Sequence, residues 1–149
     1  MAPATQQELD ATAVADRLRA TLIRLGIALR RERIAGVSPQ QVGLLVSIKH
    51  RPGVTVGDLA LDDRVSTAAM SKRISRLERD GLVARTPSEA DRRCIGLTLT
   101  EEGQRTLRRV RSRRTAWLAS RLSTLTPDEL AAVEAAAEPL ARLLEEGRA

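Results

Sequence analysis

Two neighbouring arginines, Arg92 and Arg93, follow an aspartate, Asp91, in a stretch rich in turn-forming residues. A guanidinium group is always charged and carries five hydrogen-bond donors, which suits it to phosphate oxygens and base edges. Arginines on a protruding turn can also enter a narrow DNA minor groove, where the electrostatic potential is most negative. In this interpretation Asp91 orients one arginine, Arg93. The alternative is a solvated turn in which Asp91 only balances the charge.

The segments on either side of this turn have the pattern of two β-strands. Residues 82–85 are mostly apolar, and Ile95, Leu97 and Leu99 alternate with other residues, which places them on one face of a strand. The sequence therefore predicts a β-hairpin whose tip carries the two arginines.

A helix expected from Ser66 to Arg79 precedes the hairpin, and it has two different faces. Met70, Ile74 and Leu77 are spaced i, i+4 and i+7, so they face the core. The other face begins with small or hydroxyl-bearing residues, which lets a helix sink into a major groove, and ends with cations suited to phosphate or guanine. Its residues are Thr67, Ala68, Ala69, Ser71, Lys72, Ser75 and Arg76. The alternative is an ordinary amphipathic surface helix.

No pattern in the sequence indicates catalysis, and we predict that the protein is not an enzyme. Cys94 is the only cysteine and His50 the only histidine, so neither an intramolecular disulfide nor a Cys/His metal cluster can form. There is no nucleophile with a base, no apolar pair of carboxylates and no glycine-rich phosphate loop. We interpret Cys94 as a small strand residue and His50 as a helix-end residue, and we expect neither a metal nor a cofactor.

The charge distribution favours a polyanionic partner. The chain of 149 residues has 25 basic and 19 acidic residues, a net charge of +6 and a pI near 11.0. Residues 100–121 contain seven arginines against two acids, whereas residues 122–149 contain two arginines against six acids. A basic centre and an acidic end suit a chain whose centre contacts phosphate while its end pairs with another chain.

The composition also limits which residues can form the core and indicates where in the cell the protein works. Phe and Tyr are absent and Trp117 is the one aromatic residue, so the core must be aliphatic. No apolar run approaches the roughly 20 residues of a membrane span, and the first residues lead into a charged helical pattern. We expect a soluble, cytoplasmic protein that does not interact with membranes.

Helix-start signals divide the chain into a central module and two flanking parts. A long first helix is expected over residues 8–35. Ser38 and Gln41 form the pattern of a capping box, and Thr55 with Asp58 resembles a second one. Gly81 suits the end of the helix that begins at Ser66, and Thr100 is an N-cap for a long helix. A final helix follows Thr126 and contains Pro139.

Together these segments predict one domain that is mainly α with a small β-hairpin wing. Residues 38–99 form a winged helix-turn-helix, and residues 8–35 and 100–147 form flanking helices suited to dimerisation.

Three segments resemble the MarR (multiple-antibiotic-resistance regulator) family of bacterial transcription factors. They are residues 53–60, residues 66–83 and residues 91–103, where Asp-x-Arg is followed by Leu-Thr-x-x-Gly. The resemblance implies a homodimer that reads a pseudo-palindrome in double-stranded DNA with recognition helices roughly 34 Å apart. It assigns the recognition-helix face to Thr67, Ala68, Ala69, Ser71, Lys72 and Arg76, and the wing motif to Asp91 and Arg93, with Arg92 beside them.

Members of this family commonly bind small phenolic or anionic effectors between the dimerisation helices and the DNA-binding module. This chain departs from the pattern because it lacks the aromatic walls of many such pockets. Leu22, Leu25, Leu44 and Ile48 would line an aliphatic pocket or, alternatively, pack in the core. The family's peroxide sensors carry a cysteine near the start of the first helix, and this chain has none there.

We therefore predict a ligand-responsive repressor that binds DNA sequence-specifically, because wings that occupy a promoter block polymerase. The alternative is a non-specific architectural DNA-binding protein with the same wing. Trp117 is expected to anchor the long helix at a subunit or domain interface.

Overall fold

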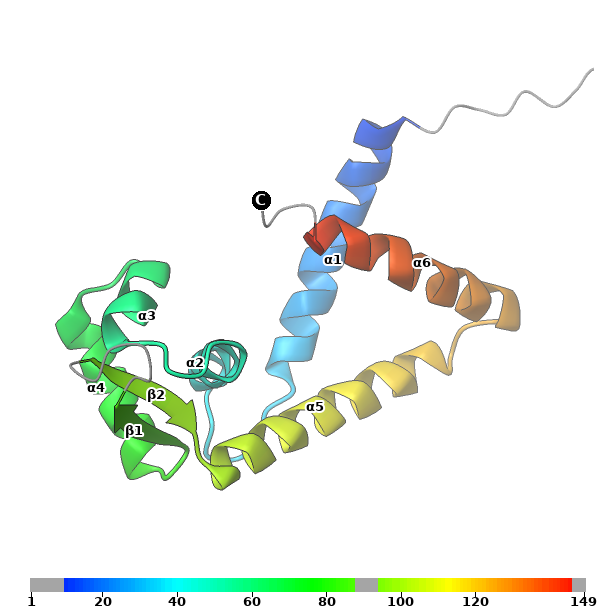
Figure 1. The fold of residues 1–149 in the computed structure, drawn as a ribbon. Helices are drawn as coiled ribbons and strands as arrows, with labels where there is room; N and C mark the ends of the chain where they lie inside the picture. The colour runs from blue at the N-terminus through cyan, green and yellow to red at the C-terminus, as the bar shows by residue number, and fades with distance from the viewer. Residues whose placement is uncertain (1–9, 88–93, 146–149) are drawn as a thin grey trace, which may run out of the picture.

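The structure is a computed structural model that describes residues 10–87 and 94–145, which form six helices and one two-stranded antiparallel sheet (Figure 1). The helices are α1 (Ala11–Arg31), α2 (Pro39–His50), α3 (Val56–Asp62), α4 (Thr67–Arg79), α5 (Glu101–Leu122) and α6 (Pro127–Glu145), and the strands are β1 (Val83–Pro87) and β2 (Ile95–Leu99). The predicted fold class, mainly α with a β-hairpin wing, is confirmed. Across the described ranges every helix is too short or too polar to cross a membrane.

The elements separate into a compact winged module (α2, α3, α4, β1 and β2) and an extended arm (α1, α5 and α6) (Figure 1). Helices α2, α3 and α4 pack with the hairpin at one end of the molecule. Helix α5 leads away from this module, and α6 turns back at its far end towards α1. The winged module and the arm meet where α5 contacts α1, α2 and β2.

Side-chain caps define the helix starts as the sequence predicted. Ser38 and Gln41 bond reciprocally at the start of α2, and Thr55 and Asp58 do the same at α3. The Thr55 hydroxyl and backbone N–H both donate to Asp58, which lowers the pKa of that carboxyl below its ordinary value. Ser66 accepts the Ala69 N–H at the start of α4. These bonds satisfy N–H groups that a helix start leaves without partners.

The first helix ends earlier than the sequence predicted. Helix α1 stops at Arg31 and not at Ala35, because the next residues form a tight turn. Ile34 and Val37 form an isolated bridge around Gly36, whose φ of 87° suits glycine, and both apolar residues pack against the core. Residues 8 and 9 of the expected helix lie outside the described ranges.

The core of the winged module is aliphatic, as the composition required. Six side chains from three elements are fully buried: Leu45, Ile48, Met70, Ile74, Leu77 and Leu97. The predicted inward face of α4 is therefore confirmed. Burial of each such side chain contributes about 1.5–3 kcal/mol, which makes this cluster the main source of the module's stability.

The hairpin is held at its base by a third extended segment. In its antiparallel register Val83 pairs with Leu99 and Pro87 with Ile95. The N–H of Leu97 donates to the carbonyl of Val54 at 2.9 Å, so Val54 forms an isolated antiparallel bridge with β2. Leu97 is fully buried whereas Ile95 is 56% exposed, because Ile95 lies beyond the core on the way to the wing tip.

The start of α5 packs directly on the polypeptide backbone. A Cβ built at Gly103 would collide with the carbonyl oxygen of Leu82, which accepts the N–H of Thr100 at 3.1 Å. We predict that Gly103→Ala lowers the free energy of unfolding by about 1–3 kcal/mol, because either α5 or the Leu82 carbonyl must move. Urea denaturation at a fixed protein concentration measures this change.

The matched control is Gly43→Ala in the exposed part of α2, where a Cβ would have no atom within 4 Å. This substitution should stabilise the protein by about 0.5–1 kcal/mol, since it removes a helix-interior glycine without a clash. Similar changes for the two variants would contradict the packing described here.

Candidate nucleic-acid interface

Helix α4 presents the face that the sequence predicted. Thr67, Ala68 and Ala69 in its first turn are exposed, and so are Lys72 and Arg76 further along. Ser71 and Ser75 are half-buried, so they lie at the edge of this face and not at its centre. A surface that starts with small side chains and continues with cations can approach a polyanionic groove closely and then hold its backbone.

Two arginines that were not predicted from the sequence belong to the same face. Arg73 and Arg79 line an open hollow of about 400 Å³ together with Ala69, Lys72 and Arg76. The signal was present in the sequence, because positions 69, 72, 73, 76 and 79 recur at helical spacing. Arg73 is held at the flank of the helix by Asp63, at 3.3 Å.

The start of α2 continues this surface. Ser38, Gln40 and Gln41 border a hollow of about 150 Å³ that Arg73 and Arg76 also line. Gln41 donates to Asp80 at the end of α4, at 3.4 Å, which connects the two helices. The hydroxyl and amide groups here are hydrogen-bond donors of the kind that contact phosphate oxygens. Ser38 and Gln40 were not predicted as site residues.

The wing is fixed to α4 by an ion pair. The Nε of Arg85, on β1, donates to both carboxylate oxygens of Glu78, on α4, at 3.0 and 2.9 Å. The two side chains are only 33% and 29% exposed, so the pair orients β1 against the helix although an exposed ion pair contributes little energy. Three predicted wing residues, Asp91, Arg92 and Arg93, lie outside the described ranges.

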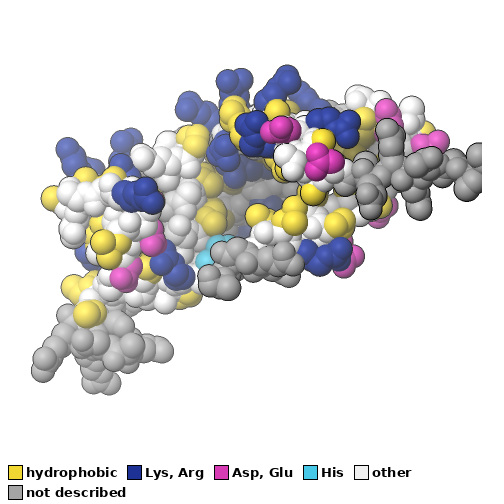
Figure 2. Space-filling model, turned by 90° about the horizontal axis from the view of Figure 1, so that it is seen from above, with side chains coloured by type: hydrophobic (Ala, Val, Ile, Leu, Met, Phe, Trp, Pro, Cys, Tyr) yellow, Lys and Arg dark blue, Asp and Glu magenta, His cyan; other side chains and the backbone are white. Residues whose placement is uncertain are grey.

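On the face shown in Figure 2, basic side chains are more prominent than acidic ones. Lys and Arg appear at the end that carries the winged module and along one long edge of the molecule, with acidic side chains fewer and scattered between them. The described surface is therefore suited to a partner with extended negative charge.

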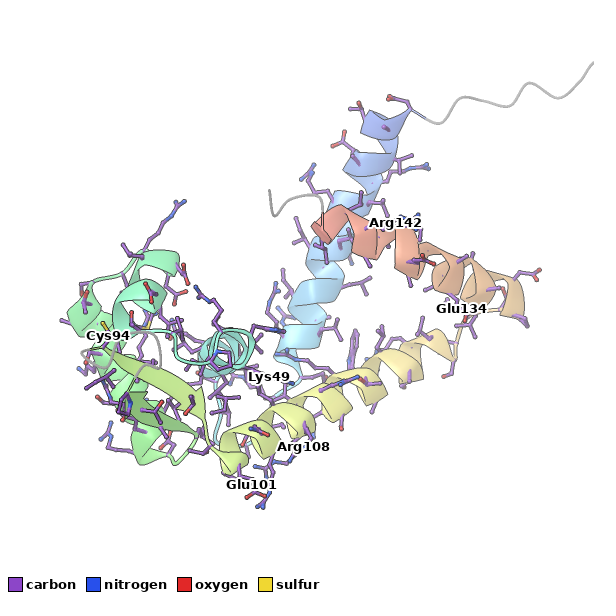
Figure 3. All side chains as sticks on the ribbon, viewed as in Figure 1. Lys49, Cys94, Glu101, Arg108, Glu134 and Arg142 are labelled. Carbon is purple, nitrogen blue, oxygen red and sulfur yellow. The ribbon has the colours of Figure 1, made fainter. Side chains whose placement is uncertain are left out.

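A second feature lies between the winged module and the arm. This hollow of about 400 Å³, here named the α2–α5 hollow, has aliphatic walls formed by Leu29, Val42, Val46, Leu107, Val110 and Leu118. Its cationic lining residues include Lys49, Arg108, Arg111 and Arg114. Lys49 lies in the last turn of α2 and Arg108 in the first half of α5, and both are labelled in Figure 3.

Of the two roles expected for four apolar residues, core packing is confirmed for Leu44 and Ile48, and a shared aliphatic pocket is not formed. Leu44 and Ile48 are buried in the core, whereas Leu22 and Leu25 are 48% and 41% exposed on α1, so these four do not share a cavity. The side chains of α2 that face α5 are Val42 and Val46 instead. His50 is at the end of α2 as expected, and Trp117 is half-buried beneath Arg121, whose guanidinium lies 4.5 Å from the ring centroid.

Comparison with known proteins gives consistent matches. The family model of the MarR family matches residues 37–95. An HTH-type transcriptional regulator of Mycobacterium tuberculosis, MT0903.1, is 32% identical over 134 residues, which is 89% of this chain and 94% of that protein. The repressor MdtR of Bacillus subtilis is 38% identical over 95 residues, which is 64% of this chain and 61% of MdtR. The crystal structure of the regulator Tm0710 from Thermotoga maritima has a TM-score of 0.77 and 25% identity, covering 91% of this chain and 96% of that one.

The Glu78–Arg85 pair gives a prediction about the wing. Glu78→Gln should increase amide hydrogen exchange in β1 and β2, because the charge that fixes Arg85 against α4 is lost, while exchange in α2 stays unchanged. The matched control is Glu138→Gln on α6, which breaks a more exposed ion pair with Arg142. Equal exchange in the hairpin of both variants would show that the Glu78 pair does not hold the wing.

Proposed function

Because the chain belongs to the MarR family of DNA-binding transcription regulators, we propose that it is a homodimeric repressor of a pseudo-palindromic operator, released by a small anionic effector. The single observation that supports the operator-binding role is the exposed face of α4. Its small first-turn residues and its later cations suit a major groove, and a β-hairpin follows at once in the chain. A protein that acts on the chromosome in this way works in the cytoplasm.

The exposed apolar residues of the arm support a homodimer. Helix α1 has 21 residues and none is buried, and Leu22, Ile23, Leu25 and Ile27 are each 41–52% exposed. On α6, Leu130, Val133, Leu143 and Leu144 are 42–77% exposed. Large exposed apolar patches mark interaction surfaces. A second copy supplies the same helices, so two copies can cover these faces reciprocally around a two-fold axis.

Two-fold symmetry also distinguishes a regulator from an architectural protein. Two winged modules on one dimer contact half-sites about 34 Å apart, which is one turn of the duplex. A non-specific architectural protein has no such spacing and little preference among sequences. Repression is favoured over activation because a dimer seated on a promoter excludes polymerase, and the relative MdtR is named a repressor.

The test is selection of operators from random duplexes, followed by footprinting of the selected sequence. We expect two protected half-sites with centres about 10 base pairs apart and a preference of about 10³-fold over unrelated DNA at physiological salt. Removing the Arg76 side chain, or that of the wing residue Arg93, should weaken binding more than removing Arg148 does. A preference below about tenfold, or a single protected site, would support the architectural alternative.

The α2–α5 hollow supports the effector part of the proposal. Its aliphatic walls and cationic residues fit a molecule with an apolar body and an anionic group, and among the described residues no Phe, Tyr or Trp lines it. The Nε atom of Arg114 is buried there without a hydrogen-bond partner among the described residues, so it is a donor in need of an acceptor. A ligand between α2 and α5 contacts both the winged module and the arm, and it therefore favours one relative placement of the two.

Sodium decanoate is a suitable first probe, with 1-decanol as its uncharged match. We expect decanoate, but not decanol, to raise the Kd for the selected operator several-fold. The variant Lys49→Gln should bind the operator with little change yet lose most of the response, because one cation of the hollow is gone. A response of equal size in this variant would place the effect of decanoate outside the α2–α5 hollow.

A further inference from the structure

A second group of arginines gathers away from α4. An open hollow of about 890 Å³ lies between the turn after α1 and the first half of α5. We name it the arginine hollow, after five of its lining residues: Arg33, Arg105, Arg108, Arg109 and Arg113. Neither the α4 face nor the α2–α5 hollow explains this concentration of charge, although Arg108 lines both hollows.

The acids nearby do not neutralise these arginines. Glu102 pairs with Arg109 at 2.8 Å and with Arg105 at 3.6 Å, and Glu101 pairs with Arg105 at 2.5 Å. From the end of α1, Glu32 pairs with Arg113 at 3.4 Å. Five cations therefore meet three anions.

Arg33 and Arg108 form no ion pair with any residue in the described ranges. The hollow thus keeps two more positive charges than negative ones. Like charges held this close repel one another, so a bound anion would relieve the cost of gathering them.

The arginine hollow lies close along the chain to a hollow that adjoins the α4 face. The hollow beside Lys72 and the hollow at the start of α2 share Arg73 and Arg76. The hollow at the start of α2 then reaches Ser38, only three residues along the chain from Ala35 in the arginine hollow. Three residues span at most about 11 Å. We refer to the three hollows together as the basic track, which takes in residues of α4, of the start of α2 and of α5.

We propose that this basic track binds the sugar-phosphate backbone of the DNA duplex, so that α5 as well as α4 and the wing contacts DNA. The inference rests on the proposed operator binding. The track is open: the side chains of Arg105, Arg109 and Arg113 are 56–60% exposed, which suits a polymer lying over them better than an enclosed small ion. These three arginines recur every fourth residue and so advance about 6 Å at a time along α5, the scale of neighbouring phosphates.

Contacts to phosphate add affinity without reading sequence. The basic track should therefore act equally on operator and unrelated DNA, and its contribution should appear as salt dependence. The logarithm of the binding constant falls with the logarithm of salt concentration, with a slope of about −0.9 for each phosphate contacted. A dimer that loses two such arginines from each subunit loses up to four contacts.

The experiment measures this slope by fluorescence anisotropy, with a labelled duplex of about 30 base pairs of mixed sequence and with the selected operator. The test variant is R33Q/R105Q, which spares the contact of Arg109 with Thr106 at 3.2 Å. Its slope should be shallower by about 2–3.6 on both duplexes, with a loss of affinity on the order of tenfold or more near 0.15 M salt. The preference for the operator should stay unchanged.

Two further variants make the result independent of folding. Arg121→Gln removes a cation at the far end of the same helix, where Arg121 lies over Trp117, and should leave the slope unchanged. Glu102→Gln removes the acid inside the arginine hollow and should have the opposite effect, a steeper slope and tighter binding. A damaged fold would not produce tighter binding.

The outcomes separate this inference from the proposed function. If the wild-type protein prefers its operator and R33Q/R105Q has an unchanged slope on both duplexes, the basic track is refuted and the operator-binding proposal stands. If the wild-type protein shows no preference but R33Q/R105Q still has a shallower slope, the operator-binding proposal is refuted and the basic track stands. Calorimetric titration with pyrophosphate covers the remaining case. Pyrophosphate binding that R33Q/R105Q abolishes, with an unchanged DNA slope, would make the hollow a small-anion site and overturn the inference.

Discussion

A set of hydrogen bonds around Thr100 connects three parts of this molecule: α4, the hairpin and α5. The hydroxyl of Thr100 donates to the carbonyl of Gly81 at 2.6 Å and accepts the N–H of Gly103 at 3.0 Å, and the N–H of Thr100 donates to the Leu82 carbonyl at 3.1 Å. Gly81 ends α4, Leu82 leads into β1, and Thr100 begins α5. Helix α4, the hairpin and the arm therefore share a single set of hydrogen bonds, and a rigid joint of this kind would transmit a movement of α5 to the parts that we propose contact DNA.

The joint depends on small residues because the backbones approach so closely. Gly81 has a φ of 72°, a conformation that side chains with a Cβ rarely adopt. Gly103 leaves no room for a Cβ beside Leu82, and a Cβ on Gly96 would lie 2.7 Å from the backbone of Gly53. Both close backbone approaches join segments distant in sequence, so the hairpin is fixed at its base by backbone packing and by Leu97, while Ile95 further out is exposed.

Local chemistry made much of this fold predictable from the sequence. The capping residues Ser38, Thr55 and Thr100 act through neighbours three residues away, so their roles are written in short motifs. The early end of α1 was not predictable in the same way, because Ile34 and Val37 leave the helix to pack against residues far along the chain. The α2–α5 hollow was missed for a related reason. Helical periodicity identifies apolar residues but does not tell which of them, such as Val46, stay partly uncovered between two elements.

The charges of α5 connect the two proposals physically. Arg108 lines both the α2–α5 hollow and the arginine hollow, so one guanidinium faces the region of the proposed effector and the region of the proposed phosphate contact. An anion bound in the α2–α5 hollow would draw Arg108 towards it and neutralise part of the potential that attracts the duplex. Thermodynamic linkage then requires that DNA bound on the basic track weaken the anion by the same factor. Effector and operator would thus oppose each other through charge on one helix, in addition to any change in the separation of two wings.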